Sequence, residues 1–139
     1  MAVLLFGLVL ITSLPASAGG GVRISRIVFN PPGNDNGSNA SLKSETVTIK
    51  NTGSSAVTLT DWILRDTDRH NFRFPEFTLR AGRSVTVHTG SGADTRRHLY
   101  WDQDAYVWNN DGDIAILRDD SGDRVDRCRY SRSGSSVNC

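Results

Sequence analysis

Apolar, β-branched residues recur at every second position through most of the chain that follows residue 21. Within residues 45–51, Val47 and Ile49 fall on one side of an extended strand and the polar residues between them fall on the other, because successive side chains of a strand point to opposite faces. No ten-residue window has the 3.6-residue periodicity of a helix. The pattern predicts an all-β protein whose sheets have one packed face and one solvated face.

Turn-forming residues divide this pattern into short strands. Gly, Pro, Asn and Asp interrupt it at the short intervals that are typical of a two-sheet β-sandwich. The expected strands are residues 22–29, 45–51, 57–65, 72–74 with 77–79, 84–89, 106–108, 113–118 and 124–130. Residues 30–44 are too rich in turn formers for a strand, so we expect a mobile surface loop there.

Residues 1–18 have the features of a signal peptide. An uncharged apolar run over residues 3–14 is followed by Ala16-Ser17-Ala18, the small-x-small pattern of a cleavage site. The run lacks a preceding Lys or Arg, and it is shorter than the roughly 20 residues that span a bilayer. We therefore expect a secreted or extracellular protein, with association to the cell surface as an alternative. The mature chain would be a single domain over residues 19–139 without a membrane span.

The chain has two cysteines, Cys128 and Cys139. An even number of cysteines in an exported protein usually means a disulfide, and the loop closed here would tie down the tail. The alternative is a bridge from Cys139 to a second chain, which would make the protein self-associating.

Charge is balanced along the chain, with 16 Lys and Arg against 15 Asp and Glu and a formal net charge of +1. The two signs are interleaved instead of forming a basic arm, so binding of nucleic acid through a strongly positive field is not expected.

Six aspartates surround one short apolar run in residues 107–128. The Asp-Gly and Ser-Gly pairs are turn chemistry, because a short carboxylate accepts backbone N–H bonds and Gly adopts positive φ. Neither cluster has the ligand spacing of a calcium loop. We therefore interpret the aspartates as turn residues, with a calcium-dependent adhesion module as an alternative that requires help from Asp35 or a second loop.

No motif of metal binding or catalysis is present in the sequence. The three histidines, His70, His88 and His98, have no spacing that places two zinc ligands on one face. There is no nucleophile elbow, P-loop or dinucleotide fingerprint. We expect no cofactor, no metal and no catalytic residue, and hence a protein that is not an enzyme.

Residues 96–108 mix basic and aromatic side chains, which can stack on sugars or bases. Arg96, Arg97, Tyr100 and Trp101 form the candidate binding surface. The alternative is that these rings fill the core beneath solvated arginines. Of the three tryptophans, we expect Trp101 at the surface and the other two, Trp62 and Trp108, in the core.

Three stretches together resemble the lamin tail domain family in its secreted bacterial form. They are SLKSETVTIKNTGSSAVTLTDWILRD, FTLRAGRSVTVHTGSG and YVWNNDGDIAILRDDSGDRVDRCRY. Their most specific parts are Glu45-x-Val47-x-Ile49-x-Asn51-x-Gly53, Trp62-x-Leu64-Arg65-Asp66 and the run from Trp108 to Asp113. The resemblance implies an immunoglobulin-like β-sandwich that serves as a non-enzymatic interaction module, for proteins and DNA in nuclear lamins and as an exported domain in bacteria.

The sequence thus predicts a secreted or cell-surface binding module with a lamin-tail-like fold. Its partner is an unknown envelope component or protein, which residues 30–44 and 96–108 would contact. The alternatives are a structural envelope protein that self-associates through sheet edges or Cys139, and the calcium-dependent adhesion module.

Overall fold

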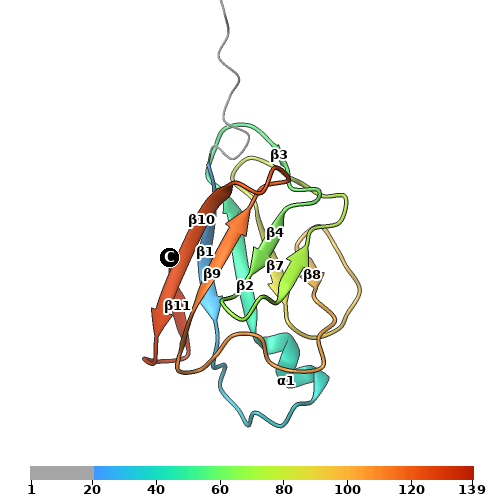
Figure 1. The fold of residues 1–139 in the computed structure, drawn as a ribbon. Helices are drawn as coiled ribbons and strands as arrows, with labels where there is room; N and C mark the ends of the chain where they lie inside the picture. The colour runs from blue at the N-terminus through green and yellow to red at the C-terminus, as the bar shows by residue number, and fades with distance from the viewer. Residues whose placement is uncertain (1–20) are drawn as a thin grey trace, which may run out of the picture.

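The strands assemble into two β-sheets and a separate two-stranded ladder (Figure 1). They enclose one hydrophobic core. The computed structural model describes residues 21–139. The predicted signal peptide, residues 1–18, lies outside the described residues. The predicted all-β, immunoglobulin-like sandwich is confirmed.

The larger sheet has five strands in the order β11, β1, β2, β7, β8. All neighbours in it are antiparallel except β7 and β8, which run parallel. The strands are β1 (Val22–Val28), β2 (Thr46–Asn51), β7 (Ser84–His88), β8 (His98–Tyr100) and β11 (Ser136–Asn138).

The second sheet has four antiparallel strands in the order β10, β9, β4, β5. They are β4 (Ile63–Arg65), β5 (Asn71–Arg73), β9 (Gly112–Arg118) and β10 (Arg124–Ser131). A two-stranded ladder pairs β3 (Val57–Thr58) with β6 (Thr78–Leu79). One short helix, α1 (Asn39–Ser44), lies beside β7.

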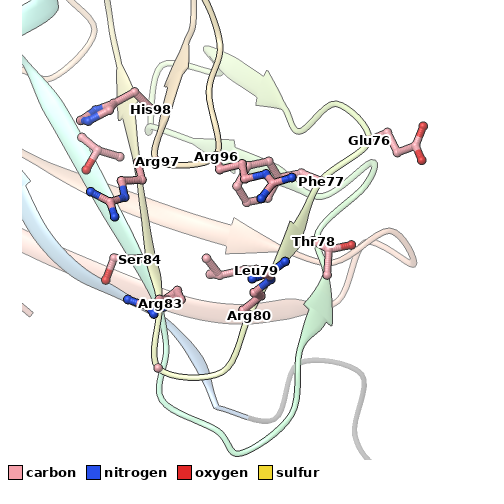
Figure 2. Close-up of a pocket in the computed structure, with 12 residues that line it drawn as sticks. Glu76, Phe77, Thr78, Leu79, Arg80, Arg83, Ser84, Arg96, Arg97 and His98 are labelled. Carbon is pink, nitrogen blue, oxygen red and sulfur yellow. The ribbon is translucent and has the colours of Figure 1, made fainter.

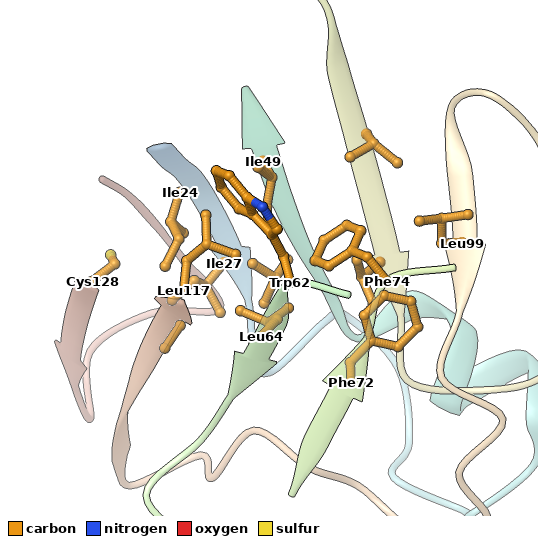
Figure 3. Close-up of a cluster of buried hydrophobic side chains, with 14 of the residues drawn as sticks. Ile24, Ile27, Ile49, Trp62, Leu64, Phe72, Phe74, Leu99, Leu117 and Cys128 are labelled. Atoms are coloured by element: carbon orange, nitrogen blue, oxygen red, sulfur yellow. The ribbon is translucent and has the colours of Figure 1, made fainter. Parts of the chain in front are cut away.

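The core is built as the alternation predicts. Val47 and Ile49 of β2 are fully buried, whereas Thr48 between them is partly exposed and Lys50 is exposed. Trp62 and Trp108 are both 2 % exposed, so the expectation that they belong to the core is confirmed. Figure 3 shows Trp62 among aliphatic and aromatic side chains from both sheets.

One side of the sandwich is closed by a covalent bond between the sheets. Cys128 of β10 is bonded to Cys139, which follows β11, so the predicted disulfide is confirmed and the intermolecular bridge is not what forms. The Cys139 N–H also donates to the Ser25 carbonyl at 2.9 Å. On the same side, an Asp126 carboxylate oxygen accepts the Ile24 N–H at 2.8 Å. Strands β1, β10 and β11 are therefore tied together.

Four local predictions were wrong. Residues 57–65 form two strands instead of one, because the chain turns between them at Asp61, whose φ is +66°. Residues 106–108 are not a strand. The short strands β8 and β11 were not predicted. Within residues 30–44, which we expected to be a loop throughout, Ser38 caps α1 by accepting the Ser41 N–H at 3.3 Å.

Candidate functional site

A cleft of about 840 Å³ opens beside the first residues of β7, and four arginines line it (Figure 2). We call it the arginine cleft. The arginines are Arg80, Arg83, Arg96 and Arg97. The lining also includes the apolar Phe77 and Leu79 and the hydroxyls of Thr78, Ser84 and Thr86.

One pair of arginines is positioned by the turn that leads into β7. The Arg83 N–H donates to the Arg80 carbonyl at 3.1 Å, and Gly82 between them has a φ of +71°, which favours glycine. Asn51, at the end of β2, accepts the Gly82 N–H at 2.8 Å with its carbonyl and donates its own N–H to Arg83 at 2.9 Å. The buried Asn51 amide also donates to the Leu79 carbonyl at 3.0 Å. Asn51 therefore fixes the backbone positions from which the Arg80 and Arg83 side chains extend.

The other pair is positioned by the turn that leads into β8. The Thr95 hydroxyl accepts the N–H groups of Arg97 and His98 at 3.2 and 3.0 Å. The Arg97 carbonyl accepts the Thr86 N–H of β7 at 2.9 Å, which extends the parallel pairing by one residue. Parallel pairing with β7 thus brings Arg96 and Arg97 to the same cleft as the first pair.

The positive charge of the cleft is not neutralised by the described residues. All four arginines are exposed, and the three ion pairs within residues 21–139 involve other side chains. Glu76 is the one acid of the lining, and its carboxylate points away from the arginines in Figure 2. Residues 1–20 contain no Asp or Glu. Because each guanidinium presents five N–H donors in a planar fork, the cleft is suited to bind phosphate or carboxylate groups.

The candidate binding surface predicted from the sequence is divided by the structure. Arg96 and Arg97 lie together in the cleft. Tyr100 does not line it and stacks on His88, with ring centroids 4.8 Å apart.

Trp101 is 8 % exposed, so the expectation that it lies at the surface was wrong. Its N–H donates to the His88 carbonyl at 2.8 Å, which continues the strand alternation beyond β8. Leu99 and Trp101 consequently point inward together. The Trp101 ring packs against Phe72 and Trp108 at centroid distances of 5.8 and 6.1 Å.

Arg80 and Arg83 were not predicted as site residues. The signal for them was the segment RAGRS, which places two arginines on either side of a glycine turn. Their proximity to Arg96 and Arg97 depends on the pairing of β7 with β8, which the sequence does not indicate.

Asp113 and Asp119, two of the aspartates of residues 107–128, accept hydrogen bonds from neighbouring groups of the same chain. Asp119 accepts the N–H groups of Ser121 and Asp123 at 3.0 and 2.9 Å, so its predicted turn role is confirmed. Asp113 is 5 % exposed and accepts bonds from Thr67 and Asn109. Within residues 21–139, no group of three or more His, Cys, Asp or Glu side chains is placed to hold a metal ion.

Glu45 is a buried carboxyl group beneath the loop that precedes β9. Its Oε1 accepts the Thr89 hydroxyl at 2.6 Å and the N–H groups of Val107 and Trp108 at 2.8 and 3.1 Å. Burial raises the pKa of Glu45 above its usual range, against the opposing effect of these bonds. The bonds also explain why residues 106–108 are not a strand, because two of their N–H groups are already used by this carboxyl.

Two packed β-sheets around a filled core are the architecture of an immunoglobulin-like domain. In the part of the chain that the structure describes, no helix is long and apolar enough to cross a membrane. The family model for the Lamin Tail Domain matches residues 15–132, and the protein therefore belongs to the lamin tail domain family. This family consists of non-enzymatic, immunoglobulin-like domains. Strand β11 and Cys139 lie beyond the matched residues. A search of curated proteins found no match.

Proposed function

We propose that this protein is a secreted or cell-surface binding module, without enzymatic activity, that holds an anionic partner in the arginine cleft. The partner is an envelope component or a protein that presents phosphate or carboxylate groups. The observation that carries this proposal is the set of four exposed arginines around one cleft, none of which is paired with an acid among residues 21–139.

A cleft of about 840 Å³ is larger than one phosphate or carboxylate group needs, so the partner presents several such groups along an extended segment. Arginine binds both phosphate and carboxylate through two parallel N–H···O bonds. The four arginines repel one another in the empty cleft, and an anionic partner relieves this repulsion when it binds.

The exported location is supported by two independent features. Residues 1–18 carry the pattern of a signal peptide. The disulfide between Cys128 and Cys139 persists in oxidising compartments outside the cytosol.

Co-sedimentation with envelope fractions of the producing cell tests the proposal. We expect the wild-type protein in the pellet and an Arg83→Gln/Arg97→Gln variant in the supernatant, because the variant loses half of the cleft's charge. The control is Arg124→Gln/Arg127→Gln, which removes the same charge from exposed positions of β10. Recovery of the wild-type protein in the supernatant, or equal retention of both variants, would contradict the proposal.

Self-association is the second candidate, and it now depends on the sheet edges because Cys139 is paired within the chain. Three of the outer strands, β5, β8 and β11, have three residues each, so they offer few free backbone groups to another chain. The fourth outer strand, β10, has eight residues and is the longest edge available for pairing. Sedimentation velocity over a wide range of protein concentration separates the two candidates. A mass that rises with concentration supports self-association, and a constant monomer mass excludes it.

A further inference from the structure

Two histidines that are ten residues apart in the sequence meet on the outer face of the larger sheet. His88 Nε2 lies 2.9 Å from His98 Nδ1. His88 is the last residue of β7 and His98 the first of β8. Their neighbours Val87 and Leu99 are buried, so the two imidazoles point away from the core.

His88 is held in a fixed orientation by two contacts. Its Nδ1 lies 2.6 Å from the Lys43 carbonyl oxygen at the end of α1, so Nδ1 carries the proton and donates it to that bond. Tyr100 stacks on the imidazole with the two ring planes 16° apart. Nε2 is therefore unprotonated and directs its lone pair toward His98.

We propose that His88 and His98 form a binding site for a divalent transition-metal ion, and that Cu²⁺ is the ion it binds best. A metal-binding histidine usually donates its second ring N–H to a carbonyl or carboxylate, which sets the tautomer and the ring orientation. The bond from His88 to Lys43 is an interaction of this kind.

The separation of the two nitrogens shows that both can reach one metal ion. Two imidazole nitrogens at about 2.0 Å from a metal lie about 2.8 Å apart at a right angle and about 3.3 Å apart at a tetrahedral angle. The observed 2.9 Å is the length of the present hydrogen bond and lies between these two values, so a small turn of His98 can bring the nitrogens to either separation. Tetragonal coordination is typical of Cu²⁺ and Ni²⁺, whereas Zn²⁺ prefers a tetrahedron.

Binding requires one rearrangement at His98. Its Nδ1 now donates to His88 Nε2, so on binding the His98 proton moves from Nδ1 to Nε2 and the ring turns its Nδ1 lone pair to the metal. His98 is exposed, which leaves the ring free to turn. The protein gains and loses no proton in this step. Water fills the remaining positions, because no third His, Cys, Asp or Glu among residues 21–139 is placed beside the pair.

Positive charge near the two histidines opposes the binding of any cation, so only an ion with high affinity for imidazole nitrogen binds well. The positive charge of Lys43 acts on His88, and Arg97 lines the arginine cleft together with His98. Asp94 accepts the N–H of the neighbouring Tyr100 at 3.0 Å. Burial lowers the pKa of His88, so this ligand is neutral at neutral pH. Cu²⁺ has the highest affinity for nitrogen ligands in the divalent series, and it is the ion that best overcomes the repulsion.

Titration of the whole protein with CuCl₂ alone at neutral pH, in a buffer that does not bind copper, tests the proposal. We expect the wild-type protein to bind one more equivalent than His88→Gln and His98→Gln do, with an electron paramagnetic resonance spectrum of two imidazole nitrogens. The matched control is His70→Gln, because His70 is paired with Asp66 at a different site. The control should bind as the wild type does, and ZnCl₂ should bind more weakly.

All variants have the same amino terminus, so copper bound there cancels in the comparison. Circular dichroism identifies any variant that does not fold, and an alanine substitution at the same position then replaces it. Equal copper binding by the wild type and His98→Gln, or loss of binding in His70→Gln, would mean an adventitious ion only and would overturn the proposal.

Discussion

The side chain of Trp101 connects strand β8 to the core. It lies between Phe72 and Trp108, and its exposed fraction of 8 % leaves little of the indole available to a ligand. Aromatic side chains next to basic residues therefore do not mark a binding surface here, because strand alternation buries one ring and exposes its neighbour.

Replacement of Trp101 by alanine should lower the free energy of unfolding by about 3–5 kcal/mol, the usual cost of removing a buried aromatic side chain. Tyr100→Ala should cost less than half as much, because Tyr100 is partly exposed. Urea unfolding of both variants measures the difference. Similar small losses in the two variants would contradict the buried position of Trp101.

Glu45 makes the free energy of unfolding depend on pH in a defined direction. Its folded pKa is raised above the usual value, so the folded state binds more protons than the unfolded chain. The contribution of Glu45 to stability is therefore greatest below its unfolded pKa and is lost as the pH rises through the folded pKa. The slope of a single proton is at most about 1.4 kcal/mol per pH unit.

Glu45→Gln should remove this term, because the amide carbonyl can still accept the N–H groups of Val107 and Trp108 but does not ionise. The free energy of unfolding of the wild type, relative to that of the variant, should fall as the pH rises from 4 toward 7. Urea unfolding at several pH values measures it. Parallel profiles for the two proteins would mean that Glu45 has an ordinary pKa in the folded state.

At the scale of elements, we expect the disulfide to hold β11 on the larger sheet. This strand has three residues, and its pairing with β1 is its one ladder. The bond between Cys128 and Cys139 closes a loop with a sequence separation of 11, and this limits the conformations open to the tail in the unfolded chain.

A Cys128→Ser/Cys139→Ser variant should lose about 3 kcal/mol of unfolding free energy, the value of the chain-entropy relation for a loop of this length. Urea unfolding of the variant measures the loss, and the wild type in reductant serves as the comparison. If reduction leaves the unfolding midpoint of the wild type unchanged, β11 does not depend on the bond.

The longer strands were predictable because burial of one face imposes alternation on them. Strands β1, β2, β7, β9 and β10 have five or more residues, and each was predicted to within about one residue at either end. Strands β8 and β11 have three residues each, which is too short for alternation to be distinguished from chance.

The arginine cleft was only half predictable for a different reason. Arg96 and Arg97 stand out in the sequence beside aromatic residues, but the cleft also needs Arg80 and Arg83. The two pairs meet because β8 joins β7 in parallel and Asn51 fixes the turn before β7. Neither contact is encoded in a local pattern.

At the scale of the whole molecule, the nearly neutral net charge conceals a local excess. The formal charge is +1, yet four arginines share one cleft without an ion pair to the described residues. Their field extends over roughly one Debye length, about 10 Å at 0.1 M salt. An anionic partner is therefore attracted at short range by the cleft and not by the molecule as a whole.

Mutual repulsion of these arginines should make the empty domain less stable at low salt. Raising the salt concentration from about 0.01 M to about 0.5 M should stabilise the wild type more than Arg83→Gln/Arg97→Gln, because screening relieves more repulsion. Thermal unfolding of both proteins measures the effect, with Arg124→Gln/Arg127→Gln as the control. The same salt response in all three proteins would mean that the arginines do not interact.

In the turns before β7 and β8, the residues that hold the backbone differ from the residues that we propose bind the partner. Asn51 and Thr95 hold the backbone of these turns, whereas the four arginine side chains make no hydrogen bond or ion pair within residues 21–139. Selection can therefore exchange the four arginines for other residues at little risk to folding. Descendants of such a gene could diverge in what they capture while retaining one scaffold, and a library randomised at these four positions would sample new specificities from a population that remains folded.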